Sequence, residues 1–279
     1  MLAKLLKYEF KATGRLFALM YGAVILLAGI NAGLIALNRA IGSTVSSIVT
    51  SLTMALYMFV AVATIIVTLV IVIVRFYRML GDQGHLWFTL PATANQHLLG
   101  KLIPAFVWSI ASLLAVAISI GLVTLRTGWY KHLNMIGEVW RHLAARGYNP
   151  TLWLICGLAF ILAAWLFQIL MLYASMSVGP LITKSRLGGS ILAYLIFYFI
   201  LQAINIGVLL ITGSLTLGIT TSLSSPSVSN TANLAMLTPA TLNQLVSRFT
   251  LCFGLEYLLV AVAFYFIARY FMTRKLNLA

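Results

Sequence analysis

The sequence predicts an all-α, polytopic membrane protein with six membrane-spanning helices, and its composition and apolar patterning both indicate this. Hydrophobic residues make up 62% of the 279 residues, and charged residues make up only 8%. Soluble domains are about half apolar and about a quarter charged. A soluble fold of this size could not cover its apolar surface with so few ionic groups. The bilayer must therefore be the solvent for most of the chain.

Six apolar stretches are long enough to cross a bilayer, which takes about 20 predominantly apolar residues. The first is too long for the apolar region of a signal peptide, and no clear Ala-x-Ala cleavage site follows it, so we expect it to remain as a span. We expect residues 1–279 to form a single membrane domain without internal repeats. The predicted spans are Leu16–Asn38, Ser47–Val74, Leu102–Leu125, Leu152–Val178, Ile191–Thr212 and Phe249–Phe271.

The charges predict an orientation. The chain carries 18 Lys and Arg against four acids, a net charge of +14. If the N-terminus is inside, twelve of the cations fall in inner segments and six in outer segments, so the positive-inside rule places both termini in the cytoplasm. A basic balance can also indicate nucleic-acid binding. Here the cations flank apolar runs, as in loops that face anionic lipid, and no nucleic-acid partner is expected.

Residues 1–15 are expected to form a basic amphipathic helix on the inner leaflet. Four cations fall within about 80° of one another on a helical projection, with leucines opposite. Glu9 falls among the leucines, where an isolated carboxylate would be costly. It therefore needs a partner, either a cytoplasmic Arg of the same chain or a soluble partner protein. The basic residues are Lys4, Lys7, Lys11 and Arg15, and the leucines are Leu2, Leu5, Leu6 and Leu16.

The connection after the second span, residues 75–101, is predicted to be an ordered cytoplasmic elbow. Its two glycines, Gly81 and Gly84, suit a helix end and a tight turn. Thr93 and Gln96 have the spacing of a capping box, which would start the next helix. Two aromatic residues of the elbow, Trp87 and Phe88, beside His85, either anchor at the membrane interface or form a docking element for a peripheral protein.

Two outer connections contain further apolar residues. The segment Arg126–Pro150 has Trp and Leu residues at near-helical spacing and predicts an amphipathic helix at the outer interface. The segment Gly213–Ser247 is uncharged but apolar in places. We expect it to form short re-entrant helices that dip into the outer leaflet and are shielded by protein.

Glu256 lies inside the sixth predicted span. A carboxylate in mid-membrane costs about 2.5–3.5 kcal/mol, so it should face the interior of the helix bundle. Asn205 and Gln202 on the fifth span are candidate hydrogen-bond partners. Three roles are open for Glu256, namely helix packing, a place in the substrate path or at a subunit interface, and proton coupling.

No catalytic motif was found, so the chain is not expected to be an enzyme. A phosphate-binding loop needs Gly-x-x-x-x-Gly-Lys-Ser/Thr, but Gly100-Lys101 lacks the preceding glycine and is followed by Leu102. Glu138 and His142 share a helical face, and two ligands do not make a metal site. We expect no cofactor and no metal.

Two segments resemble a known family. The segment Lys4–Arg15 resembles the opening of bacterial permeases of the type 2, export class of ATP-binding-cassette (ABC) transporters. Gly81-Asp-Gln-Gly-His-Leu-Trp-Phe-Thr-Leu-Pro91, with the capped helix that follows, resembles their loop between helices two and three. Members often carry an acid where this chain has Gln83 and an aromatic residue where it has His85. The family also has six helices with both ends inside.

The resemblance implies a permease subunit in the bacterial cytoplasmic membrane, paired with a second, identical or different permease subunit over two cytoplasmic ATPase subunits. It implies export, and the apolar, sparsely charged spans predict an amphipathic cargo such as a peptide, lipid or drug. An ion-coupled secondary transporter and a non-transporting assembly or enzyme component are the alternatives. The residues implied in coupling to the ATPase are Glu9, Asp82, His85, Trp87, Phe88 and Gln96, and those of the substrate path or helix packing are Glu256 and Asn205.

Overall fold

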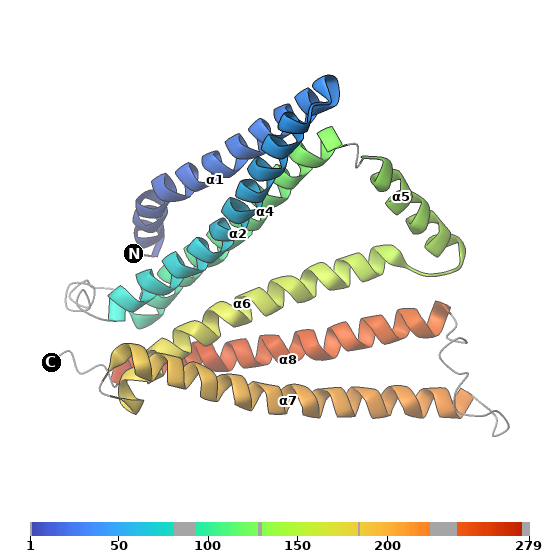
Figure 1. Ribbon diagram of the computed structural model, residues 1–279. Helices are drawn as coiled ribbons and strands as arrows, with labels where there is room; N and C mark the ends of the chain where they lie inside the picture. The colour runs from blue at the N-terminus through green and yellow to red at the C-terminus, as the bar shows by residue number, and fades with distance from the viewer. Residues whose placement is uncertain (1, 81–92, 128–129, 184, 224–238, 275–279) are drawn as a thin grey trace. The chain divides into compact units, whose positions relative to one another are not determined.

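The computed structural model describes residues 2–80, 93–127, 130–183, 185–223 and 239–274, and these residues form seven α-helices and no strand (Figure 1). The predicted all-α class is therefore confirmed. The helices are α1 (Leu2–Ile41), α2 (Thr44–Leu80), α4 (Ala94–Thr127), α5 (Tyr130–Ala145), α6 (Pro150–Ile182), α7 (Arg186–Leu223) and α8 (Pro239–Arg274).

All the described helices except α5 are long and apolar enough to cross a membrane, and each contains one of the six predicted spans. The chain is thus a multi-pass membrane protein. The helices exceed the length that a bilayer requires. With 40 residues, α1 is about 60 Å long at 1.5 Å per residue, whereas the hydrocarbon core is about 30 Å thick. Each long helix must therefore tilt in the bilayer or extend beyond the hydrocarbon core.

The N-terminal helix is not separate from the first span. The helix α1 runs without interruption from Leu2 to Ile41, and Figure 1 shows that its first turns bend away from the rest. The hydroxyl of Thr13 donates a hydrogen bond to the carbonyl of Glu9, four residues earlier, at 2.7 Å. This type of back-bonding often bends a helix without breaking it.

The two long connections expected to contain further helices differ in how well they were predicted. The helix α5 confirms the helix expected within Arg126–Pro150. It is followed by Gly147, whose φ of +84° is a conformation that glycine adopts readily. The expectation of short separate helices in Gly213–Ser247 is wrong for the described residues. Here α7 continues to Leu223, and α8 begins at Pro239, because a proline is well tolerated in the first turn of a helix. Residues 224–238 lie outside the described part.

The chain divides into two compact units, which are described separately. The first comprises Met1–Met135 and Met272–Ala279, and the second comprises Ile136–Phe271. In the first unit, α1 packs chiefly on α4 and also on α2. Two glycines lie in this interface, where a Cβ at Gly100 would make ordinary contact with Leu5 and a Cβ at Gly14 would make ordinary contact with Trp108.

Buried hydroxyl groups link the helices of the first unit. The hydroxyl of Ser112 on α4 shares hydrogen bonds with Tyr21 of α1 at 2.8 Å and with Thr68 of α2 at 2.7 Å. Further along α4, Ser119 shares a hydrogen bond with Tyr57 of α2 at 2.9 Å. Such bonds contribute to helix association in a bilayer, because lipid tails are as apolar as the helix surfaces and no hydrophobic force drives the helices together.

In the second unit, the helices meet through close backbone contacts and stacked rings. At the tight connection between α6 and α7, a Cβ at Gly179 would collide with the backbone of Ser190. The ring of Tyr257 on α8 stacks on two rings of α6, with centroids 5.4 Å from Phe160 and 5.0 Å from Phe167. A hydrogen bond from the side-chain amide of Gln168 on α6 to the hydroxyl of Tyr194 on α7, at 2.9 Å, adds a polar link.

Candidate functional site: an ionic junction of three helices

The site begins with the rotation of α1 about its own axis. Glu9, Thr13 and Phe17 follow one another at intervals of four residues, so they share one face of the helix. All three are buried, and Glu9 is only 6% exposed. The four cations on the opposite face are exposed, as the sequence predicted. The helix therefore turns its only carboxylate inward and its basic face outward.

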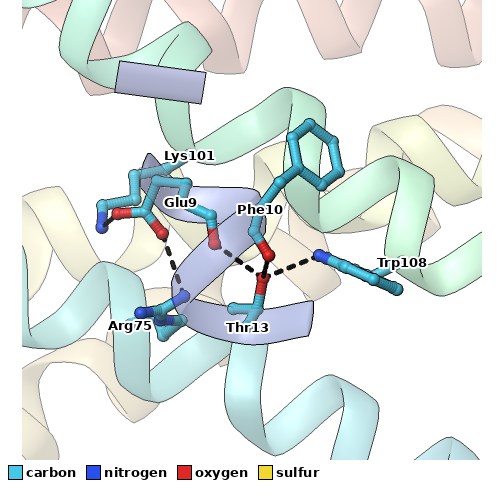
Figure 2. A network of polar contacts seen from close by, with 6 residues as sticks. All are labelled: Glu9, Phe10, Thr13, Arg75, Lys101 and Trp108. Atoms are coloured by element: carbon cyan, nitrogen blue, oxygen red, sulfur yellow. Dashed lines mark hydrogen bonds and ion pairs between the residues drawn. The ribbon is translucent and has the colours of Figure 1, made fainter. Parts of the chain in front are cut away.

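Glu9 forms ion pairs with cations from two other helices (Figure 2). Its Oε2 lies 3.0 Å from Nη1 of Arg75 on α2. Its Oε1 pairs with Nζ of Lys101 on α4, which also donates a hydrogen bond to it. The Arg75 contact is an ion pair without the alignment of a hydrogen bond. One carboxylate thus joins α1, α2 and α4, and we call this group the ionic junction.

The ionic junction is largely shielded from solvent. The side chains of Glu9 and Lys101 are each 8% exposed, and that of Arg75 is 31% exposed. Breaking a buried ion pair leaves an uncompensated charge and costs several kcal/mol, about 3–5 in measured cases. Two cations share one carboxylate here, so the loss of Glu9 would leave both without a counter-charge in this group. Glu9 is therefore central to the arrangement.

A second set of contacts fixes the same turn of α1. The indole N–H of Trp108 on α4 donates a hydrogen bond to the Thr13 hydroxyl at 2.8 Å. The same indole stacks on Phe17, with ring centroids 4.5 Å apart. As Figure 2 shows, Thr13 and Glu9 lie on consecutive turns and both reach toward α4. The rotation of α1 is thus set by charge and by ring packing together.

The ionic junction includes Arg75 and Lys101, the two end residues of the predicted elbow, residues 75–101. Arg75 is five residues before the end of α2 at Leu80, and Lys101 is seven residues after the start of α4 at Ala94. Glu9 therefore ties α1 to both helices that flank residues 81–92. A displacement of these two helix ends would act directly on α1.

The sequence predictions for this region had different outcomes. The expected link between Glu9 and an arginine of the same chain is confirmed, and the carboxylate of Glu9 is buried. Sequence reasoning missed Lys101. A signal was present, because Leu98, Lys101, Leu102 and Ala105 have the spacing of a single helical face, and the structure buries all four.

The start of α4 partly confirms the capping box. The side-chain Oε1 of Gln96 accepts a hydrogen bond from the backbone N–H of Thr93 at 3.4 Å, which is one arm of the box. Gln96 thus has a structural role at the helix start. The other residues assigned to coupling, which are Asp82, His85, Trp87 and Phe88, lie outside the described residues.

Glu256, the second predicted site, lies on α8 and is 7% exposed. Within the described part of the chain, neither of its carboxylate oxygens has a hydrogen-bond partner. The prediction that Asn205 or Gln202 binds Glu256 is therefore wrong, and the side-chain amide of Asn205 donates instead to the carbonyl of Leu201 on its own helix at 2.9 Å. A helical amide can satisfy itself in this way, whereas a carboxylate, which only accepts when ionised, cannot.

The described residues contain no group of three or more His, Cys, Asp or Glu that could hold a metal ion. No protein-family model, no curated protein and no solved structure matches the chain. The chemistry of the ionic junction is electrostatic. Its geometry can bind three helices into one body and transmit force between them.

Proposed function

We propose that the chain is the permease subunit of an ABC exporter, in which ATP is hydrolysed by a separate cytoplasmic ATPase subunit. Two observations support this. The segments Lys4–Arg15 and Gly81–Pro91 resemble the corresponding segments of type 2 ABC permeases. In addition, Glu9 in the first segment pairs with both helices that flank the second. This second observation carries the proposal, since it gives the two segments a mechanical connection.

In the proposed mechanism, ATP binding closes a pair of ATPase subunits against residues 81–92. The push reaches the ends of α2 and α4, and Glu9 passes it to α1. Because interfaces and packed cores have discrete arrangements, such a push would rock the helices as rigid bodies and open a path for an amphipathic substrate. A second permease subunit, identical or different, would line the other side of the path. The complex would reside in a bacterial cytoplasmic membrane with both termini of this chain inside.

Site-directed labelling tests the orientation that this proposal requires. After Cys156 and Cys252 are replaced by Ala, single cysteines are introduced by Trp87→Cys and, as a matched control in α5, by Val139→Cys, whose side chain is exposed. In intact cells, a membrane-impermeant maleimide should label only position 139. In inside-out vesicles it should label only position 87. Labelling of position 87 from outside the cell would rule out the proposed coupling loop.

Crosslinking tests the ATPase partner. A photo-crosslinking amino acid at position 87 should trap a protein that carries a phosphate-binding loop, and the same amino acid at position 139 should not. The trapped protein should co-purify stoichiometrically in mild detergent, and the ATPase activity should disappear without it. Transport by the purified chain alone in sealed vesicles would contradict the proposal.

Glu256 favours a second candidate, an ion-coupled secondary transporter, because a buried carboxylate within a span marks the ion pathway in many such proteins. This candidate predicts that a pH gradient drives uptake or export in vesicles that contain only this chain. It also predicts that Glu256→Gln abolishes this transport. Transport that needs ATP and the partner ATPase would exclude it.

A further inference from the structure

The basic face of α1 has a fixed direction. Because Glu9 is held by Arg75 and Lys101, α1 cannot rotate about its axis without breaking both ion pairs. The opposite face, about 160° away on the helical projection, therefore points away from α2 and α4. It carries four exposed cations over about 16 Å of helix. They are Lys4, Lys7, Lys11 and Arg15.

The charge at this end of the first unit is not balanced within the chain. Glu9 is already shared by two cations, and Asp82 is the only other acid in the first 130 residues of the sequence. Arg78, one turn beyond Arg75 on α2, is exposed as well. Five exposed cations thus belong to this end of the unit. Because the whole chain has only four acids against 18 Lys and Arg, most of the opposite charge must come from outside the chain.

The position of the face indicates where this charge comes from. Arg15 is followed directly by the apolar part of α1, which is long and apolar enough to cross a membrane. The basic face therefore starts at the boundary between hydrocarbon and headgroups and continues outward along turns that bend away from the span (Figure 1). Phospholipid headgroups occupy this zone, and long basic side chains near helix ends reach toward it.

We propose that the basic face of α1 binds the phosphate groups of anionic phospholipids of the surrounding bilayer. The lysines supply point charges, and Arg15 supplies a planar pair of N–H donors that matches two phosphate oxygens. Basic residues near an anionic membrane surface each add to the attraction, and the attraction is weakened by salt. The ionic junction holds the face toward the lipid. This inference does not depend on the proposed transport function.

The test compares two variants with the same net charge. In the first, Lys4, Lys7, Lys11 and Arg15 are all replaced by Gln. In the control, the four cations of the segment Arg126–Pro150 are replaced by Gln, namely Arg126, Lys131, Arg141 and Arg146. The net charge of both variants therefore falls from +14 to +10. The full-length proteins are placed in nanodiscs of phosphatidylcholine. Electron spin resonance of spin-labelled phosphatidylglycerol and phosphatidylcholine then measures which lipid is enriched at the protein surface.

The wild-type protein and the control variant should enrich phosphatidylglycerol several-fold over phosphatidylcholine, and high salt should reduce this enrichment. The Gln variant of the basic face should lose most of it. The charge-conserving variant Lys4→Arg/Lys7→Arg/Lys11→Arg should retain it, which separates charge from any effect on folding. An equal loss in the control variant, or unchanged enrichment in the basic-face variant, would overturn the proposal.

A second arm of the test separates lipid from an acidic protein partner. Soluble polyglutamate is titrated against the wild-type protein in nanodiscs of phosphatidylcholine alone and in nanodiscs that contain phosphatidylglycerol. If the face binds lipid, phosphatidylglycerol should suppress polyglutamate binding. Polyglutamate binding that depends on the four cations but is indifferent to phosphatidylglycerol would assign the face to a protein instead.

Discussion

The two units of this protein hold their helices together by different means. In the first unit, polar side chains form the links, from the ionic junction at Glu9 to the hydroxyl bonds of Ser112 and Ser119. In the second unit, close backbone contacts at Gly179 and stacked rings around Tyr257 prevail, and the hydrogen bonds from Gln168 to Tyr194 and between Asn243 and Asn149 add to them. Polar links depend on particular partner atoms, whereas packing links depend on shape. The two units should therefore respond differently to the same type of substitution.

The two buried carboxylates show this difference most clearly. Glu9 has two cationic partners, and Glu256 has no hydrogen-bond partner among the described residues. Both are nearly inaccessible to solvent. Glu9 stabilises the first unit through its ion pairs, whereas the burial of Glu256 without a hydrogen bond destabilises the second unit. Replacing each by Gln should thus have opposite consequences.

The largest effect is expected from Glu9→Gln. This change leaves Arg75 and Lys101 without their shared counter-charge and should lower the free energy of unfolding by about 3 kcal/mol. The measurement is unfolding of the purified protein in mixed micelles with increasing denaturing detergent. Glu138→Gln, which removes an exposed carboxylate of α5, is the control and should have almost no effect.

A double substitution gives a further check on Glu9. If the cost arises from the uncompensated charge of Lys101, then Lys101→Met should restore part of the stability lost in Glu9→Gln, since the two effects would not be additive. Equal destabilisation by Glu9→Gln and Glu138→Gln would show that the ionic junction does not stabilise the first unit.

In the second unit, Gly179→Ala should be the damaging change. The new methyl group would collide with the backbone of Ser190, and overpacking of this kind costs about 1–3 kcal/mol. Gly207→Ala on α7 is the matched control, because a Cβ there meets nothing within 4 Å. It should leave the thermal unfolding temperature unchanged or raise it, as Ala favours helix. A harmless Gly179→Ala would mean that close backbone contact is not what holds α6 and α7.

A smaller loss is expected from Ser112→Ala in the first unit. It removes hydrogen bonds to Tyr21 and Thr68, and interhelical hydrogen bonds of membrane proteins are worth about 0.6 kcal/mol each, about 1.7 at most. Ser51→Ala is the control, since Ser51 is exposed and bonds only to its own helix among the interactions described. Similar unfolding midpoints for the two variants would show that the hydroxyl links contribute little.

The smallest effect on stability is expected from Glu256→Gln. No partner is lost, and a group that can ionise is removed from an apolar region, so the free energy of unfolding should stay the same or rise slightly. A marked destabilisation would mean that Glu256 has a partner outside the described residues or in another subunit. If transport is lost while ATP turnover by the complex continues, Glu256 belongs to the substrate path rather than to helix packing.

Local patterns in the sequence predicted much of the fold. Each span is a continuous apolar stretch, and the outward face of α1 follows from the spacing of four cations, because a helix repeats on a fixed period. The helix boundaries were less predictable. The separate helix expected for residues 1–15 is part of α1, and both described ends of Gly213–Ser247 extend α7 and α8. The bilayer requires a minimum length of helix and does not limit how far the helix continues.

The partners of the two carboxylates were the hardest part to predict. The sequence showed that Glu9 needed a counter-charge and that an arginine was a candidate, but not which one, and it did not show that Lys101 would join it. For Glu256 it suggested Asn205, which instead bonds within its own helix. Partner choice depends on which faces of distant helices meet.

The sequence by itself determined that this protein resides in a membrane, how many times the chain can cross it, and which side of α1 is basic. All three properties depend on residues that are close together in the chain. Only the tertiary structure decided that Glu9 meets Arg75 and Lys101, 66 and 92 residues away, while Glu256 meets no such group in the described chain. Ion pairs require atoms within about 4 Å of each other. Such proximity arises only when the helices have packed at a particular rotation and depth.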